Sequence, residues 1–232
     1  MASIQRIFPA LNTNALSFVR KPVGALGQWD QASAVYGAQG ARYAGPSAGT
    51  VQIQAVPQFN AVPGGATQSL LLAQFVSDPL RSVLISALAW NVGFALQLAN
   101  AAATYTWRGR AALFVLNGST GQRRATLFDT SNVGSGARTV TTERTCLASI
   151  TGLAAQVRAG DCLCLEIGIE IVNSAASLAP QVSLFAGGLS PITADNVAAS
   201  DAQTVLEAPQ SLLLSLPAPG EQPNARVTRA DA

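Results

Sequence analysis

The sequence predicts an all-β fold, an antiparallel, jelly-roll-like β-sandwich, and two patterns in its 232 residues support this prediction. From about residue 69 to residue 216, apolar side chains recur at every second position, and clusters of turn residues separate the runs. A period of two places alternate side chains on opposite faces of a strand, whereas a helix repeats every 3.6 residues. The flanking regions 1–68 and 217–232 lack this period, so we expect an extended N-terminal arm and a short extended C-terminal tail.

The longest alternating run lies between residues 83 and 98. Its even positions, apart from Ser86, are large and apolar, whereas its odd positions hold mostly Ala, Gly, Asn and Gln. The apolar even positions are Leu84, Leu88, Trp90, Val92, Phe94, Leu96 and Leu98. The stretch 82–107 has no charged residue and is long enough to span a bilayer, but a spanning helix would be apolar on all sides. We therefore expect a strand here and no membrane segment.

Turn residues divide the central region into roughly eight strands. Tight turns are expected at 117–121 (NGSTG) and 157–161 (VRAGD), because Asn and Gly tolerate the positive φ angles of such turns. The Gly- and Ser-rich stretch 132–136 predicts a loop, and Pro209 is expected only at an edge or a bulge. The expected strands cover 83–98, 104–107, 111–117, 124–129, 138–150, 162–169, 181–185 and 204–216.

The strand expected at 162–169 has two chemically different faces. Leu163, Leu165, Ile167 and Ile169 share one face, and Cys162, Cys164, Glu166 and Gly168 share the other. We expect the Leu/Ile face to enter the core, and Glu166 and Glu170 to face solvent or a neighbouring subunit. Together with Cys146 the cysteines number three, which is not a disulfide framework, and we expect them to be buried as small apolar side chains.

Residues for enzymatic chemistry are scarce. The absence of histidine excludes Ser-His-Asp and Cys-His nucleophilic systems and leaves a zinc site without ligands. Phosphate-binding glycine motifs are absent from the sequence as well. Asp161 and Glu166, with Glu170 also near, are the first candidates for a pair of catalytic carboxylates, but Asp161 is typical of a turn. We therefore predict a protein without catalytic residues, metal or cofactor.

The N-terminal arm contains three large aromatic residues in a segment too rich in Gly, Ala, Pro, Gln and Asn to form a core of its own. These are Trp29, Tyr36 and Tyr43, and one short strand is expected at 50–56. One hypothesis is that the aromatic side chains dock on neighbouring subunits. The alternative is an irregular flap that covers its own domain.

The composition favours association with other proteins. Hydrophobic residues make up 49% of the chain and charged residues 11%, compared with about 25% charged residues in a typical soluble domain. Such weakly charged surface is suited to burial against other subunits. The 14 basic residues, of which Lys21 is the single lysine, are scattered along the sequence without a block. Since nucleic-acid binding needs clustered cations, we expect no direct contact with nucleic acid.

The region 74–214 resembles a loosely defined group of tailed-bacteriophage virion proteins with jelly-roll domains. The resemblance rests on the order of the segments 75–80 (FVSDPL), 90–94 (WNVGF), 159–168 (AGDCLCLEIG), 185–188 (FAGG) and 207–209 (EAP). It implies a repeated virion component that is assembled in the host cytoplasm. It also implies a symmetric homo-oligomer, often a trimer, that contacts major capsid or neck and tail proteins.

A head-decoration or cement-type subunit is the first function that this resemblance implies, with the arm gripping adjacent capsid subunits. A neck, tail or baseplate protein is the second. A carbohydrate-binding module for cell-surface attachment is a third hypothesis, because exposed aromatic side chains can stack on sugars. Trp90 and Trp107 fall in expected strands and are predicted to be core residues, which leaves this third hypothesis few aromatic side chains.

Overall fold

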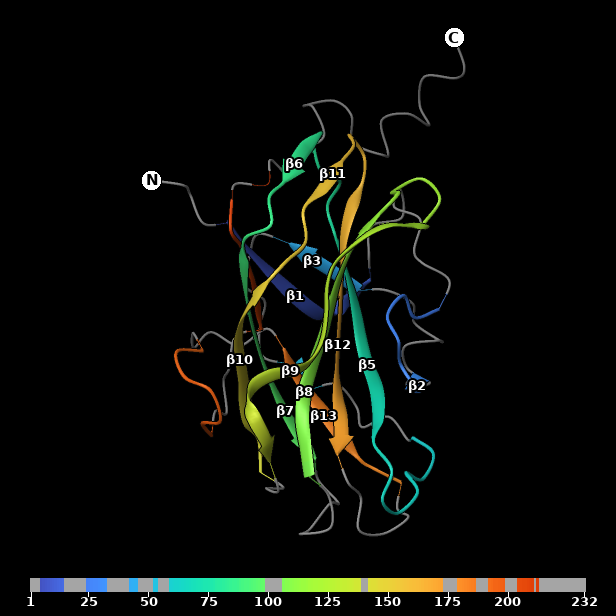
Figure 1. The fold of residues 1–232 in the computed structure, drawn as a ribbon, viewed down its shortest axis with the longest axis vertical. Helices are drawn as coiled ribbons and strands as arrows, with labels where there is room; N and C mark the ends of the chain where they lie inside the picture. Colours follow the sequence, from blue (N-terminus) through green and yellow to red (C-terminus); the bar gives the residue numbers. More distant parts are fainter. Residues whose placement is uncertain are drawn as a thin grey trace.

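The computed structural model describes residues 5–14, 24–32, 42–45, 52–53, 59–98, 106–138, 142–172, 179–186, 192–198, 204–210 and 212. Every regular element in these ranges is a β-strand, which confirms the predicted all-β fold class (Figure 1). The strands are β1 (Gln5–Asn14), β2 (Gln31–Ala32), β3 (Arg42–Gly45), β4 (Gln52–Ile53), β5 (Gln68–Ser77), β6 (Val83–Ile85), β7 (Ala89–Leu98), β8 (Thr106–Leu116), β9 (Arg123–Arg138), β10 (Arg144–Thr151), β11 (Ala155–Val157), β12 (Cys162–Val172), β13 (Val182–Ala186) and β14 (Val205–Ala208). A search of the same ranges found no helix with the length and apolar character that crossing a bilayer requires.

The strands form two layers that β1 joins at one side. The β12 sheet contains β9, β8, β12 and β5, with β2 and β3 placed end to end along the free edge of β5. The β7 sheet contains β10, β7, β13, β14 and β4. In β1, residues Gln5 to Ile7 pair with β14, and residues from Phe8 onward pair with β3. All pairings are antiparallel except those of β2 and β3 with β5.

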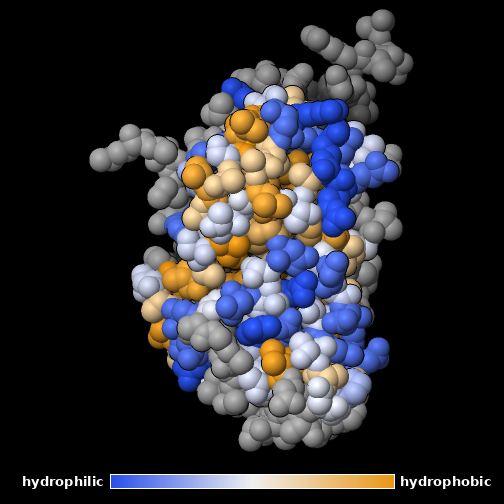
Figure 2. All heavy atoms as spheres, viewed as in Figure 1, coloured by the Kyte–Doolittle hydropathy of each residue, from blue (hydrophilic) through white to orange (hydrophobic). Residues whose placement is uncertain are grey.

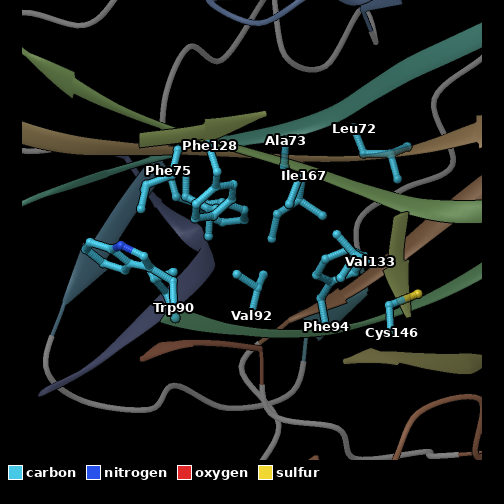
Figure 3. Packing of buried hydrophobic residues seen from close by; sticks show 14 of the residues in the cluster. Leu72, Ala73, Phe75, Trp90, Val92, Phe94, Phe128, Val133, Cys146 and Ile167 are labelled. Atoms are coloured by element: carbon cyan, nitrogen blue, oxygen red, sulfur yellow. The ribbon is translucent and has the colours of Figure 1, made fainter. Parts of the chain in front are cut away.

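The core lies between these two layers. Figure 3 shows Leu72, Ala73 and Phe75 of β5, Ile167 of β12, and Phe128 and Val133 of β9 directed toward Trp90, Val92 and Phe94 of β7 and Cys146 of β10. Trp90 and Trp107 are both fully buried, which confirms the prediction that they are core residues. The even positions of β7 from Trp90 to Leu98 all point inward, as the alternation predicts.

Before residue 89 the alternation predicts the wrong buried face, because the expected strand 83–98 is divided into β6 and β7. Leu84 and Leu88, predicted to face the core, are 59% and 46% exposed. In β6 the buried side chain is the odd-numbered Ile85, whereas in β7 the even-numbered residues are buried. The irregular residues 86–88 shift the phase by one position, and a one-residue shift moves every side chain to the opposite face. As a result β6 leaves the sheet and pairs with β11 in a separate two-stranded ribbon.

The loop predicted at 132–136 is also wrong, because these residues lie within β9. Strand β9 pairs with β8 through four register shifts, two of which lie on either side of Gly109. Gly134 adopts a φ of +107°, which favours glycine. A Gly- and Ser-rich stretch therefore marks bulges in a long bent strand here, not the end of a strand.

Both predicted turns are confirmed. The side-chain Oδ1 of Asn117 accepts a hydrogen bond from the N–H of Ser119 at 2.9 Å, and Gly121 has a φ of +74°. In the second turn Gly160 has a φ of +87°, and Oδ2 of Asp161 accepts a hydrogen bond from the N–H of Arg158 at 2.9 Å. These contacts are the local side-chain-to-backbone bonds that make Asn and Asp common in turns.

Several parts of the predicted N-terminal arm pair with the chain's own sheets. Strands β1 and β3 join β14 and β5, and β4, within the strand expected at 50–56, pairs with β13. The sequence could not show this, because the partner strands lie far along the chain. Strand β14 ends just before Pro209, in agreement with the expected restriction on that residue. The tail predicted at 217–232 lies outside the described residues.

Candidate functional site

The first candidate site is the outer face of β12, which points away from the core. The side chains of Cys162, Cys164, Glu166 and Glu170 lie on this face and are all buried. The expectation that Glu166 and Glu170 face solvent or a neighbouring subunit is therefore wrong for Glu166, which is 0% exposed, and for Glu170, which pairs with Arg108 of the same chain. The residues that cover Glu166 come from the segment 24–32, which we call the covering segment.

Glu166 fixes the covering segment through both carboxylate oxygens. Its Oε1 accepts hydrogen bonds from the backbone N–H of Leu26 at 2.7 Å and from the side chain of Gln74 at 2.8 Å. Its Oε2 accepts hydrogen bonds from the N–H of Gly27 at 2.9 Å and from the indole N–H of Trp29 at 2.7 Å. Hydrogen bonds to an ionised acceptor are about twice as strong as those between neutral groups, and here four donors offset the burial of the carboxylate.

Trp29, a predicted docking residue, does dock, and it docks on its own subunit. Its ring lies beneath the Arg110 guanidinium, with 4.8 Å between the guanidinium carbon and the ring centroid. It also covers Gly168, where an added Cβ would lie 2.5 Å from a ring carbon of Trp29. For the covering segment, the structure thus follows the flap alternative. Tyr36 lies outside the described residues, and only the backbone of Tyr43 is described, in β3, so their docking on neighbouring subunits stays a prediction.

Further polar contacts hold the covering segment at both ends. The Arg123 guanidinium donates to the carbonyl oxygen of Leu26 at 2.7 Å. At the other end, Oδ2 of Asp30 accepts from the N–H of Ser69 at 2.7 Å, and the Asp30 N–H donates to the Ser69 carbonyl oxygen at 2.9 Å. Arg110 donates a hydrogen bond to Ser69 Oγ at 2.7 Å and forms an ion pair with Asp129 at 2.8 Å. The segment is therefore clamped along its length.

A small apolar cluster lies beneath the covering segment. It contains Val76, Ala112, Phe114, Leu116, Cys162 and Cys164, with Leu26 packed against it. Burial, together with the nearby carboxylates of Asp161 and Asp78, raises the pKa of the Cys162 thiol to about 12. Burial, the Glu166 carboxylate and Cys162 likewise raise the pKa of the Cys164 thiol well above its ordinary value.

Native protein is expected to be inert toward Ellman's reagent at about pH 8, because the thiolate is the reacting species and raised pKa values keep both thiols protonated. Adding denaturant should release all three cysteines for reaction. The measurement is absorbance at the thionitrobenzoate band before and after unfolding. Rapid modification of one or more thiols in folded protein would show that the outer face is open to solvent.

Two features of the sequence, other than the alternation of apolar residues, indicate that this face is covered. Strand β8 is apolar at every position from Ala111 to Leu116, and such continuous runs are typical of strands buried on both faces. Its neighbour β12 carries Cys162 and Cys164 on the face opposite the core, which is also uncommon for a solvated face. Both features predict a cover, although neither identifies the covering segment.

The two carboxylates considered as a catalytic pair, Asp161 and Glu166, both have structural partners. Asp161 is buried and accepts a hydrogen bond from Arg124 Nε at 2.8 Å, while Glu166 binds the covering segment. Among the described residues, no group of three or more Cys, Asp or Glu side chains is placed to hold a metal ion. The arrangement around Glu166 is therefore suited to holding two parts of the chain together.

The second candidate site is exposed and lies on the ribbon of β6 and β11, at the end of the molecule drawn at the top of Figure 1. Leu84, Leu88 and Leu153 are exposed there, Leu153 by 63%. Leu88 and the residue before Leu153 are adjacent, because the N–H of Gly152 donates to the Leu88 carbonyl oxygen at 3.0 Å. Figure 2 shows hydrophobic atoms gathered over this end. Leu84 belongs to β6, Leu88 lies between β6 and β7, and Leu153 lies between β10 and β11. We call these three leucines, together with the ribbon, the β6–β11 surface.

No protein-family model matches the chain, and no curated protein matches it either. Among solved structures, the chain is similar to the structure of infectious bursal disease virus Gx strain, with a TM-score of 0.26, 9% identity, and coverage of 80% of this chain and 44% of that one. It is also similar to the crystal structure of the infectious bursal disease virus VP2 subviral particle, with a TM-score of 0.26, 11% identity, and coverage of 82% and 44%. The chain spans less than half the length of either protein. At these values the likeness carries no argument about function.

Proposed function

We propose that the chain is a non-enzymatic structural subunit of a virus particle, in the first place a head-decoration or cement-type subunit of a tailed bacteriophage. The observation that carries this proposal is the β6–β11 surface. Its three leucines are exposed at one end of a well-packed sandwich, and the backbone of Leu88 is bonded to the residue before Leu153. Contiguous exposed apolar patches on a folded protein mark interaction sites.

The energy available at this surface suits a repeated joint. Burying one leucine side chain contributes about 1.5–3 kcal/mol, before the ordering cost of association is subtracted. Three leucines that are already half exposed therefore supply a few kcal/mol per contact, which is modest for one copy and large when summed over a shell. The low charge of the chain favours the same kind of burial.

The resemblance to tailed-phage virion proteins supports the setting. A neck, tail or baseplate position uses the same surface and differs in copy number, which quantitative gel analysis of particles measures. The carbohydrate-binding hypothesis loses support, because Trp90 and Trp107 are buried in the core and cannot stack on a sugar.

The test uses particles assembled without this chain, to which purified full-length protein is added before sedimentation. The double variant Leu84→Gln/Leu153→Gln is expected to bind at least about tenfold more weakly than the natural sequence, since two apolar anchors are lost. Val197→Gln is the matched control, because Val197 is also exposed but lies near Thr145, at the opposite end of β10. Equal binding by the double variant, or no binding by the natural sequence, would overturn the proposal.

A further inference from the structure

We propose that the β6–β11 surface binds a different polypeptide whose contact area is apolar at its centre and acidic at its margin. This inference rests on the proposed function and identifies the partner of the same surface by its chemistry. It follows from where the fold places three arginines that are far apart in the sequence, Arg81, Arg124 and Arg158.

The three arginines meet around Asp161. Arg124 Nε lies 2.8 Å from Oδ1 of Asp161, and the N–H of Arg158 donates to Oδ2 of the same carboxylate. Arg81 follows Leu80, whose N–H donates to the Asp161 carbonyl oxygen at 2.6 Å and whose own carbonyl oxygen accepts from Gly160 at 2.9 Å. Cations that are scattered along the sequence are thus brought together at this place in the fold.

Two of the arginines, Arg81 and Arg158, lie near Leu84 along the ribbon. Leu84 lies opposite Gln156 across the ribbon, and Arg158 follows Gln156 by two residues, which places both on the same face. On the other strand, Arg81 precedes Leu84 by three residues. Figure 2 shows the same juxtaposition, with strongly hydrophilic atoms beside the hydrophobic area at this end.

The charge of this border is positive. Three guanidinium groups stand against two carboxylates, the buried Asp161, whose side chain already bonds Arg124, and Asp78, which lies close enough to Asp161 to act on the same Cys162 thiol. Arg81, Arg124 and Arg158 are all exposed, and the guanidinium groups of Arg81 and Arg158 form no ion pair with any side chain that the structure describes. Exposed guanidinium groups recognise carboxylates through paired hydrogen bonds, so a partner with Asp or Glu at the margin is complementary.

A second copy of the chain is a poor partner for this surface. Two copies meeting through the same face would bring like-charged arginines together, which is unfavourable. Five carboxylates of the chain are also committed to intramolecular bonds, namely those of Asp30, Asp129, Asp161, Glu166 and Glu170. Nucleic acid fits less well than protein, because three exposed leucines gain nothing from a phosphate backbone.

The experiment extends the particle assay with a charge-reversed variant, Arg81→Glu/Arg158→Glu, and a matched variant that retains charge, Arg81→Lys/Arg158→Lys. Arg124 is left unchanged because it holds the buried Asp161. We expect the Glu variant to bind particles at least about tenfold more weakly, the Lys variant to bind within about threefold of the natural sequence, and natural binding to weaken as salt is added.

Three outcomes would overturn the inference. The first is natural affinity in the Glu variant while Leu84→Gln/Leu153→Gln binds weakly, which leaves the proposed function standing. The second is a dimer in sedimentation equilibrium that Leu84→Gln/Leu153→Gln dissociates, which makes a second copy the occupant. The third is tight binding of a double-stranded DNA oligonucleotide that the Glu variant abolishes. Failure of the natural sequence to bind particles at all is different, since it removes the proposed function itself.

Discussion

Replacing Glu166 by alanine is expected to release the covering segment from the β12 sheet and to lower the free energy of unfolding by about 3 kcal/mol. Hydrogen bonds to a charged acceptor contribute about 1.5–3 kcal/mol each, and Glu166 accepts four of them. The loss is smaller than their sum because a detached segment regains bonds to water. The loss in free energy of unfolding therefore cannot exceed the free energy with which the covering segment docks on the β12 sheet.

Chemical denaturation measures the change in stability, and Trp29 fluorescence together with limited proteolysis of residues 24–32 measures release. Glu166→Gln is the control, because an amide retains one acceptor oxygen and nearly the same volume. It should hold the segment more weakly than Glu166 and more firmly than alanine. An alanine variant with natural stability and protected residues 24–32 would show that the carboxylate does not fix the segment.

Gly168→Ala is expected to cost about 3 kcal/mol, at the upper end of the range for overpacking. A Cβ at this position would lie 2.1 Å from the carbonyl oxygen of Leu70 on β5 and 2.5 Å from the Trp29 ring. The first of these atoms belongs to the backbone of the neighbouring strand, which cannot rotate away as a side chain can. The bulge between Ile167 and Gly168 in the pairing of β12 with β5 would have to open.

Gly65→Ala separates this steric effect from the general effect of losing a glycine. Gly65 has a φ of +76° with open space around it, so alanine there should cost only about 1–2 kcal/mol of backbone strain. Thermal and denaturant unfolding of the two variants gives the comparison. If Gly168→Ala were no more destabilising than Gly65→Ala, the close approach of β5 and Trp29 would not be what requires glycine at 168.

Local patterns were sufficient for the parts of the fold whose cause is local. The alternation of Trp90, Val92 and Phe94 correctly predicted which face of β7 enters the core. The turns at Asn117 and Gly160 were predictable because the special backbone angles there need particular residue types. Period and turn chemistry act over a few residues, so the sequence displays them directly.

The remaining features depend on pairing across long distances in the chain. The phase change between Ile85 and Trp90 is not evident in a list of apolar positions, since Leu84 and Leu88 share the even numbering of the buried residues of β7 and a single serine at position 86 is the one interruption. The burial of Glu166 depends on a segment about 140 residues earlier. The arginine cluster arises only when β6 pairs with β11. No short window of sequence contains both partners of these contacts.

Strand β1 spans the two layers, and its ladder cannot be completed until β14 has been synthesised. Arg6 of β1 lies opposite Glu207 of β14, so β1 leaves the ribosome about 200 residues before the strand that completes its ladder. Closing such a long loop is entropically slow, and folds rich in distant pairings form slowly. During synthesis β1 therefore has unpaired backbone groups, and chaperones or neighbouring nascent chains have time to reach them.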